Sequence, residues 1–387
     1  MRIVLASEVY PPRAGGAGWS TRALALGLRA AGHDVTVVTT SPGTADLDGL
    51  DVRRLVVRGR KRFAAPRVFA RALRAIDADV VHAQHSLSAL GALSLDRPAR
   101  VAVTVRDHWP VCFWSTRISQ GALCPECGPG PMTRCVVGRI PGPPPLRWAP
   151  IPYMGLDLAV KRRALRQAGA TIAVSEAIAG ELRAYGIPRV EVIPNMVDPV
   201  EALATAAPPP SFALPERFLL YVGKIEENKG ARLLVSAVAA ARTGLPLVVL
   251  GEGTVSHAIK FDAASAGVPL VIRGWAERED VLRSLARATA LVFPSLWPEP
   301  LSRVLLEALA LGTPVAAMAT GGTAELLGPD GAGLVVEDAP GLADAVARLA
   351  GDPALRERTR AAARRRAEAY FPAALIPRYE AAYRRLG

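Results

Sequence analysis

The sequence predicts an α/β protein built from two parallel-sheet domains of the Rossmann type. At 387 residues the chain is long for one hydrophobic core and has the length of two ordinary domains. Half of its residues are apolar and 21% are charged, which is typical of a globular protein. Short apolar runs alternate with helical patterns along the whole chain, as in successive βαβ units.

Two series of strands are expected, one in each half of the chain. The first series comprises residues 2–6, 34–39, 52–57, 79–82, 101–105, 171–174 and 190–193. The second series comprises residues 218–222, 247–250, 270–272, 291–293, 315–317 and 333–336. Between them lies a stretch rich in proline and small residues, which predicts an interdomain linker.

These patterns predict four segments. The first domain is residues 1–198 and carries a cysteine-containing insert at 107–140. The linker is residues 199–215, the second domain is 216–365, and a last helical segment is 366–387.

The net charge of +12 and the pI near 10 raise the question of nucleic-acid binding. The chain has no zinc-finger, RRM or KH pattern, and only 5% of its residues are aromatic. We therefore expect no nucleic-acid partner. Without a long apolar run or a signal peptide, the sequence favours a cytoplasmic protein.

Glu299 and Glu307 are the most informative residues. They follow the apolar run 290–293, which reads as a buried strand, and Glu307 lies inside an amphipathic helix expected to start near Ser302. Open α/β sheets bind ligands at the carboxyl ends of their strands. Eight residues along a helix place two side chains about 80° apart. Apolar neighbours such as Leu305 would take the buried side, which leaves both glutamates free to face a ligand.

Carboxylates in this position suit vicinal hydroxyls, because an ionised carboxylate offers several acceptor sites. The first helical amides, at Leu301, Ser302 and Arg303, would bind anionic oxygens. Hydroxyls together with phosphate indicate a nucleotide sugar. The alternative is a pair of ordinary surface glutamates.

The whole segment resembles the E-x7-E signature of glycosyltransferase family 4, including Gly312-Thr-Pro-Val and Gly321-Gly-Thr-Ala-Glu. The resemblance extends along nearly the full chain. It implies the GT-B architecture of two Rossmann-like domains facing across a cleft, with the last helix crossing back to the first domain. It also implies a retaining, metal-independent hexosyltransferase in polysaccharide or glycoconjugate biosynthesis, with a UDP- or GDP-sugar donor and an unidentified glycan, lipid-linked or small-molecule acceptor.

A glycine-rich turn containing Gly15, Gly16 and Gly18 follows the first predicted strand and leads into a helix. Glycines let the backbone approach a ligand, and the helix start offers free amides. The resemblance places Gly16 near the donor and Gly15 and Gly18 near the acceptor. The alternative is a simple strand-to-helix turn.

Lys224 and Lys229 flank the turn after the strand at 218–222 and are predicted to bind a diphosphate and stabilise the departing nucleotide. Lys224 stands where the family usually has arginine, which puts a bidentate contact in doubt. The alternative is a solvated lysine pair. By resemblance, Arg273 contacts the base through its backbone, and Gly321 and Gly322 contact the donor.

Residues 103–109 match a segment in which many relatives have His-Asp, with the histidine on the transferred sugar. Here Arg106 takes the histidine position and Asp107 is aligned. Asp107 is the first candidate for the proton acceptor and His108 the second. His82 and His85 end a strand on the same edge and could line the acceptor pocket. The alternative for His108 is a packed core residue.

All four cysteines, Cys112, Cys124, Cys127 and Cys135, fall in one insert with the spacing C-x11-C-x2-C-x7-C. Clustered cysteines in an intracellular protein favour a structural zinc, and with a single C-x-x-C, reduced thiols or a disulfide stay open.

Three other functions are compatible with parts of this sequence. A GT-A enzyme needs a metal-binding Asp-x-Asp, which Asp46/Asp48 and Asp77/Asp79 fit in pattern, but neither follows a phosphate loop, so we interpret both as coincidences. A nucleotide-sugar 2-epimerase and a non-catalytic binding protein share the fold, although the glutamates and lysines speak against the latter.

Residues 53–76 interleave nine basic residues with apolar ones, which predicts peripheral contact with an anionic surface such as the inner face of a membrane or an anionic glycan. The alternative is a solvated arginine-rich face.

Overall fold

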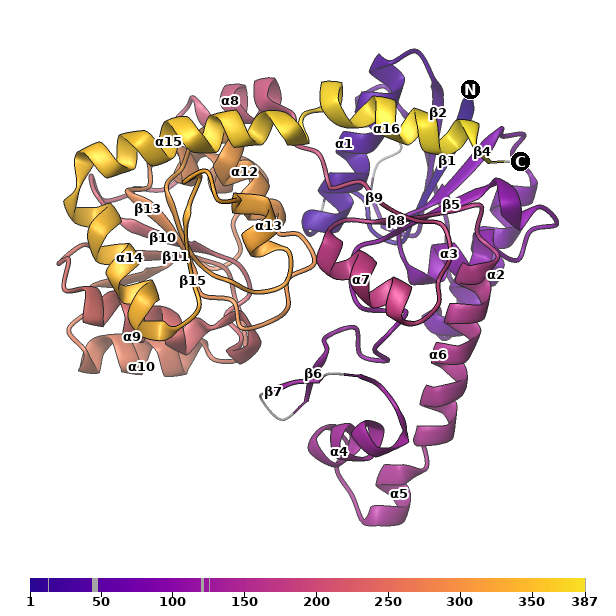
Figure 1. Ribbon diagram of the computed structural model, residues 1–387, viewed down its shortest axis with the longest axis horizontal. Helices are drawn as coiled ribbons and strands as arrows, with labels where there is room; N and C mark the ends of the chain where they lie inside the picture. The colour runs from indigo at the N-terminus through magenta and orange to yellow at the C-terminus, as the bar shows by residue number, and fades with distance from the viewer. Residues whose placement is uncertain (13, 44–47, 120–121, 125, 387) are drawn as a thin grey trace. The chain divides into compact units, whose positions relative to one another are not determined.

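The computed structural model describes residues 1–12, 14–43, 48–119, 122–124 and 126–386. It divides into two compact units, unit 1 (residues 1–196 and 372–387) and unit 2 (residues 197–371). Each unit is a parallel sheet with helices packed around it, as Figure 1 shows. The predicted α/β class with two Rossmann-like domains is thereby confirmed.

The sheet of unit 1 has seven parallel strands in the order β3-β2-β1-β4-β5-β8-β9. The central strands are buried along their whole length, as both faces carry helices. The strands are β1 (Arg2–Ser7), β2 (Asp34–Thr39), β3 (Asp51–Arg54), β4 (Val80–Ala83), β5 (Val101–Val105), β8 (Ala170–Ala173) and β9 (Val190–Val192). The main helices are α1 (Gly16–Ala30), α2 (Lys61–Arg74), α3 (Ser86–Ala92), α6 (Ile151–Arg166), α7 (Glu176–Ala184) and α16 (Pro372–Arg384).

The sheet of unit 2 has six parallel strands in the order β12-β11-β10-β13-β14-β15. The chain runs outward from β10 in one direction and then from β13 in the other, so the strand order reverses between them. The strands are β10 (Leu219–Val222), β11 (Leu247–Leu250), β12 (Leu270–Ile272), β13 (Ala290–Phe293), β14 (Val315–Met318) and β15 (Leu334–Val336). The helices are α8 (Pro199–Ala206), α9 (Ala231–Ala241), α10 (Ser256–Ser265), α11 (Arg278–Arg287), α12 (Arg303–Leu311), α13 (Thr323–Leu327), α14 (Ala339–Gly351) and α15 (Pro353–Ala367).

Every predicted strand is present, with one clear difference in length. The strand expected at 52–57 ends at Arg54. Its neighbour β2 ends at Thr39, whose carbonyl accepts the N–H of Leu55, so no partner strand remains beyond that point. Val56 is accordingly 76% exposed.

The segment predicted as a linker, 199–215, is instead an ordered part of unit 2. Asp198 caps α8 by accepting the amides of Val200 and Glu201. At the other end, the guanidinium groups of Arg283 and Arg287 on α11 donate to the last carbonyls of the helix. Proline and alanine therefore start and pack a helix here rather than extend a linker.

The segment predicted as one closing helix, 366–387, is divided at Phe371. α15 belongs to unit 2, whereas α16 packs in unit 1 beside α1. Phe371 is extended, because the following Pro372 disfavours a helical residue before it. In the core of unit 1, His82 Nδ1 bonds the Tyr383 hydroxyl at 2.7 Å and Nε2 bonds the Thr104 hydroxyl at 2.7 Å.

The cysteine-containing insert lies in unit 1. It contains a hairpin of β6 (Ile118–Ser119) and β7 (Ala122–Leu123), followed by α4 (Pro129–Arg139) and α5 (Pro144–Trp148). Figure 1 shows α4 and α5 beside the start of α6, at the end away from the sheet. Among its described residues, Met132 and Val136 form a buried apolar cluster with Met154 and Leu158 of α6.

Within the described part of the chain, none of the helices has the length and apolar character needed to span a membrane.

The buried His82 predicts a pH dependence of stability. Burial, with help from the nearby Arg106, lowers the pKa of His82 to about 3, whereas an unfolded histidine titrates near 6.5. The unfolded chain therefore binds more protons between these values, and His82 makes the free energy of unfolding fall by up to about 1.4 kcal/mol per pH unit below pH ~6.5. We expect His82→Gln to reduce this slope in urea unfolding followed by circular dichroism.

His257→Gln, which changes an exposed histidine of α10, is the matched control. Equal slopes in the native protein and in His82→Gln would contradict the prediction.

Candidate active site

The candidate donor site of unit 2 lies at the carboxyl ends of β10 and β13, where the strand order reverses. This position is the usual ligand site of open α/β sheets. The loops after β10, β13 and β14 approach one another so closely that glycine is required at two contacts. A Cβ at Gly230 would collide with the carbonyl of Pro294, and one at Gly321 with the backbone of Glu299. Both residues also have positive φ, 70° and 54°.

Lys229 and Glu299 form the centre of this site. The Lys229 ammonium bonds Glu299 Oε1 at 2.5 Å, and the Ser295 hydroxyl donates to the same oxygen at 2.9 Å. The ammonium also lies 3.9 Å from the centre of the Trp297 ring. Burial lowers the pKa of Lys229, an effect that Glu299 opposes. Lys224 lies on the same loop with an exposed side chain. The structure thus brings three predicted site residues to adjacent loops, together with Ser295 and Trp297, which the sequence reasoning missed.

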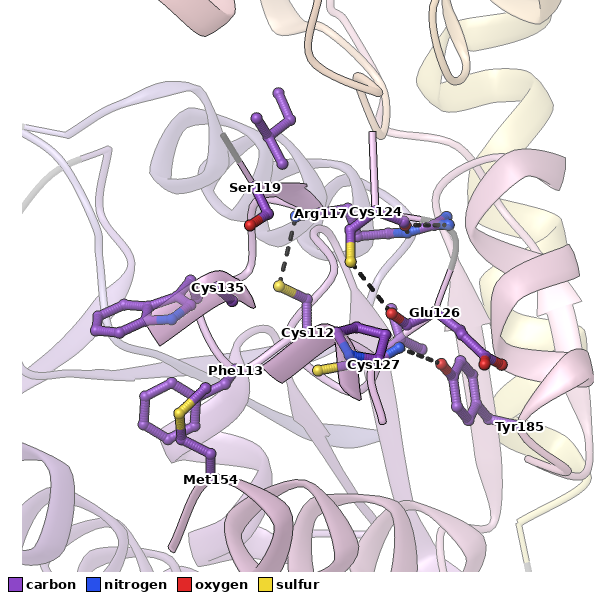
Figure 2. A pocket seen from close by; sticks show the side chains of 14 residues that line it. Cys112, Phe113, Arg117, Ser119, Cys124, Glu126, Cys127, Cys135, Met154 and Tyr185 are labelled. Carbon is purple, nitrogen blue, oxygen red and sulfur yellow. Dashed lines mark hydrogen bonds between the residues drawn. The ribbon is translucent and has the colours of Figure 1, made fainter. Parts of the chain in front are cut away.

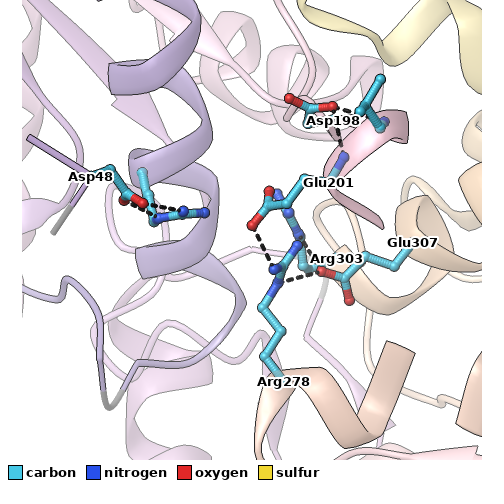
Figure 3. A network of polar contacts seen from close by, with 8 residues as sticks. Asp48, Asp198, Glu201, Arg278, Arg303 and Glu307 are labelled. Atoms are coloured by element: carbon cyan, nitrogen blue, oxygen red, sulfur yellow. Dashed lines mark hydrogen bonds and ion pairs between the residues drawn. The ribbon is translucent and has the colours of Figure 1, made fainter. Parts of the chain in front are cut away.

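Glu307 is held in a network of charged side chains, shown in Figure 3. Its Oε1 accepts from Arg303 at 2.9 Å and from Arg278 at 3.3 Å. Arg278 also binds Glu201 of α8 at 2.9 Å. We expected both glutamates to face a ligand freely, yet Glu299 and Glu307 are only 5% and 4% exposed. The expectation of free glutamates was wrong, because both carboxylates are buried and buried carboxylates require cationic or hydrogen-bonding partners.

The start of α12 lies between these two glutamates. Ser302 is its N-cap residue and makes no side-chain capping bond, while Leu301 is buried. The amides of the first turn are therefore not capped by Ser302 and point along the helix axis toward its N-terminus. The loop after β14 adjoins this segment, since the Gly322 amide donates to the Glu299 carbonyl at 2.7 Å.

Arg273 follows β12, and its side chain turns away toward residues 212–213. Its guanidinium donates to the carbonyl of Ala213 at 2.9 Å and lies over the Phe212 ring. The predicted base contact concerns the backbone of Arg273 and stays a prediction.

In unit 1, the glycine-rich turn leads into α1. Gly15 is the N-cap residue, Gly16 is exposed at the first turn, and no side chain caps the helix. Gly18 is buried, and a Cβ there would press against Ala14 and Tyr10. Packing therefore accounts for Gly18, while Gly15 and Gly16 leave backbone accessible.

Asp107 lies just after β5, and its Oδ1 accepts the amide of Trp109 at 2.8 Å. Burial raises the pKa of Asp107. A second carboxylate, that of Glu8, lies just after β1. Burial raises the pKa of Glu8, and the negative charge of Asp107 acts in the same direction. Glu8 accepts the amides of Leu87 and Ser88 at the start of α3. The sequence reasoning missed Glu8, although it ends the first strand on the expected edge.

Arg106 and His108 point into unit 1. The Arg106 guanidinium binds the side-chain oxygens of Gln84 and Asn195. His108 is 2% exposed and binds Glu181 of α7 at 2.8 Å. Burial favours a structural role for both, and their contact with an acceptor stays a prediction.

His85 is the N-cap residue of α3, and its Nδ1 contacts the Ser7 hydroxyl at 3.2 Å. Its Nε2 is buried without a hydrogen-bond partner among the described residues. Burial and the charge of Arg106 lower the pKa of His85 to about 3, so the ring is neutral. His82, by contrast, is fully used by Tyr383 and Thr104 inside the core, which removes it from the acceptor pocket.

The four cysteines line one cavity of the insert, shown in Figure 2, and all four are free thiols. Burial raises the pKa of Cys124 and that of Cys127, the latter to about 11. Across the described ranges, no three histidine, cysteine or acidic side chains are drawn together closely enough to hold a metal ion. Of the two Asp-x-Asp patterns, Asp77 and Asp79 pair with Arg2, and Asp46 lies outside the described residues.

Comparisons with known proteins show which family this chain belongs to. The model of Glycosyltransferase Family 4 matches residues 14–201, and that of Glycosyl transferases group 1 matches residues 207–366. The glycogen synthase of Mycobacterium tuberculosis is 30% identical over 96% of this chain and 91% of its own. The 2-deoxystreptamine glucosyltransferase of Streptomyces kanamyceticus is 33% identical over 51% of this chain and 56% of its own.

Solved structures show the same fold. Sucrose-phosphate synthase from Thermosynechococcus elongatus has a TM-score of 0.70 at 22% identity, covering 100% of this chain and 99% of its own. Anabaena HepE, solved in complex with UDP-glucose, has a TM-score of 0.70 at 16% identity, covering 98% of both chains. Together with the two family models and the full-length relative, they identify the chain as a GT-B glycosyltransferase of family 4 that transfers a sugar from a nucleotide-sugar donor.

Proposed function

We propose that this glycosyltransferase moves a hexose from a UDP- or GDP-sugar to an acceptor hydroxyl with retention of anomeric configuration and without a catalytic metal. The observation that carries the proposal is the Lys229–Glu299 pair at the switch point of unit 2, next to the start of α12. Cations and helix amides in this arrangement provide the positive charge that a departing diphosphate needs.

Each donor group has a partner in unit 2 under this proposal. The diphosphate binds the ammonium groups of Lys224 and Lys229 and the first amides of α12. The two arginine hydrogen bonds described for Glu307 reach Oε1, and we assign Oε2 to the ribose hydroxyls. Glu299 orients hydroxyls of the transferred sugar, because its backbone is fixed by the Gly321–Gly322 turn.

The anomeric configuration is retained because the acceptor oxygen attacks the anomeric carbon from the same face that the diphosphate leaves. As the bond from the anomeric carbon to the leaving oxygen breaks, the acceptor oxygen bonds that carbon from the same side. The acceptor proton passes to the leaving diphosphate oxygen, which gains negative charge at that moment. Lys224 and Lys229 stabilise the charge that the proton does not neutralise.

The acceptor groups that we propose are in unit 1. Asp107 offers a buried carboxyl group that can orient the acceptor hydroxyl by a hydrogen bond, and the neutral His85 offers a buried ring nitrogen for another. Relatives named for glycogen, 2-deoxystreptamine and lipopolysaccharide core differ widely in acceptor, so the class of acceptor is left open.

A screen of UDP- and GDP-hexoses by thermal shift, followed by release of the nucleotide with and without glycan and aminocyclitol acceptors, tests the proposal. Proton NMR of the product gives the anomeric configuration. Inversion at the anomeric carbon, or a requirement for added divalent metal, would refute the mechanism. Conversion of the donor sugar to its 2-epimer without an acceptor would instead identify an epimerase.

Lys224→Met and Lys229→Met should each lower kcat by about 10²- to 10³-fold, the scale for removing one stabiliser of a developing anion. Lys260→Met, on the exposed face of α10, is the matched control and should leave kcat unchanged. Native kinetics in either lysine variant would remove that lysine from the site.

Glu307→Gln should weaken donor binding more than turnover, whereas Glu299→Gln should lower turnover more than binding.

The glycine turn beside Glu299 predicts a second effect. Gly321→Ala forces a side chain against the Glu299 backbone at φ 54°, so we expect loss of donor affinity and stability. Gly331→Ala is the control, because it has φ 75° with no atom within 4 Å of the new Cβ and therefore carries the conformational strain alone. Both are compared by urea unfolding and by calorimetric titration with UDP-glucose and GDP-mannose. Equal effects of the two substitutions on stability and binding would show that the close contact is unimportant.

We also propose that the basic side of α2 contacts an anionic surface, the inner face of a membrane in the first instance. The exposed basic residues on α2 and in the turn just before it are Arg58, Arg60, Lys61, Arg67, Arg71 and Arg74. The ring centre of half-exposed Phe63 lies 6.4 Å from that of Tyr153 on α6. Further along α6, Leu156 and Val160 are also exposed. Apolar and basic groups side by side are the features of an interfacial contact. Arg54 and Arg62 belong to the basic segment predicted from the sequence, but their side chains have partners within unit 1. Arg54 donates to the carbonyl of Pro11, and Arg62 pairs with Asp157.

Changing Arg58, Arg60, Lys61 and Arg67 to glutamine should reduce sedimentation with vesicles of anionic phospholipid at low salt by tenfold or more, since each basic group contributes about 1 kcal/mol at such a surface. The control carries the same charge change in unit 2, at Lys260, Arg348, Arg358 and Arg365, which are exposed. Native protein that does not sediment, or equal loss in both variants, would exclude specific contact through α2.

A further inference from the structure

The insert between β5 and α6 has too small an apolar core to fix its own conformation. Among the described residues, its cluster has four buried members, two of them from α6, with a few partly buried side chains packed against it, and its hairpin has two residues in each strand. Small segments with so little buried apolar surface usually require disulfides or a metal. The described structure contains four free thiols in this insert and no disulfide among the described residues.

The four thiols come from separate stretches of chain and line the same cavity of about 20 Å³. Cys112 follows the loop after β5, Cys124 and Cys127 follow the hairpin, and Cys135 lies on α4. Figure 2 shows these residues around the cavity with Phe113, Arg117 and Tyr185. A volume of this size holds about one water-sized sphere, and thus a single ion.

Polar groups beside the cavity can support thiolates once a bound metal has displaced the thiol protons. The backbone N–H of Arg117 donates to Cys112 Sγ at 3.4 Å, and that of Phe113 bonds Cys127. Amide groups directed at sulfur stabilise a ligating thiolate and orient it. Arg117 and Arg134 lie close enough to Cys124 for their positive charge to act on it, and would offset the double negative charge of a divalent ion with four thiolates.

We propose that Cys112, Cys124, Cys127 and Cys135 bind one structural zinc ion that closes the insert onto unit 1. Tetrahedral sulfur coordination is the usual form of a structural zinc site, with Zn–S distances of about 2.3 Å and sulfur atoms about 3.8 Å apart. Among the described residues no three such side chains already lie close enough to hold a metal ion, so binding would draw the thiols together and release their protons. Zinc is favoured over magnesium or calcium because those ions select oxygen ligands.

The position of Cys112 gives the site its consequence for the rest of unit 1. The amides of Val111 and Cys112 both donate to the carbonyl of His108, so a metal at Cys112 also fixes the turn that follows Asp107. The ion would therefore be structural, apart from the reaction itself, and its presence is measured independently of transferase activity.

The test is elemental analysis of the full-length protein purified without chelators, combined with thiol titration. We expect about one zinc per chain, thiols that are protected in the native protein, and four that react once the protein is denatured with a chelator. Cobalt substitution should give the charge-transfer and d–d absorption bands of a tetrahedral thiolate complex. Cys112→Ser and Cys135→Ser should each lower the zinc content at least fivefold, whereas Ser119→Ala, which changes another residue lining the cavity, should not.

Two results would overturn the proposal. The first is a zinc content near zero together with four thiols that react in the native protein, which would show reduced cysteines. The second is fewer than four reactive thiols after denaturation without reductant, which would show a disulfide. If a serine variant fails to fold, removal of the metal from the native protein and its return, followed by cobalt absorption, decides the question.

Discussion

The ion pair between Lys229 and Glu299 is the interaction on which the candidate donor site depends. It joins the loop after β10 to the loop after β13 across the point where the strand order reverses. A buried charge without a partner costs several kcal/mol, so each residue stabilises the other in its loop. Gly230 and Gly321 are required because the backbones must come close enough for this pair to form. The reversal of strand order brings the two loops together, the two glycines let their backbones come close, and the ion pair then holds them in place.

Charge compensation also explains why the second glutamate is embedded. Glu307 shares two arginines with its surroundings, and one of them links it to α8 through Glu201. Helix α8, predicted as a linker, is consequently part of the support for the proposed ribose contact. A carboxylate held by fixed cations stays ionised and oriented before any ligand arrives, which lowers the cost of ordering it on binding.

The sequence was sufficient for the strands and for the start of α12, because apolar periodicity and strand-to-helix turns are local signals. It placed the charged residues on the correct loops but not their burial. The partner of Glu307, Arg278, is 29 residues away, and no local pattern indicates such a pair. The same limit applies to α8, where prolines and alanines suggested a linker because its packing against α11 is a tertiary effect. The burial of His108 against Glu181, 73 residues further along the chain, is likewise a tertiary effect that no local pattern indicates.

Arg106 shows how one substitution redistributes roles in unit 1. Where the resembled family has a histidine, this chain has a guanidinium that binds Gln84 and Asn195 inside the unit. Its positive charge adds to burial in lowering the pKa of both His82 and His85. Two histidines on this sheet edge are thereby neutral hydrogen-bonding groups and poor general acids near neutral pH. Asp107, whose pKa burial raises, is left as the carboxyl group on this edge that can hold an acceptor hydroxyl by a hydrogen bond.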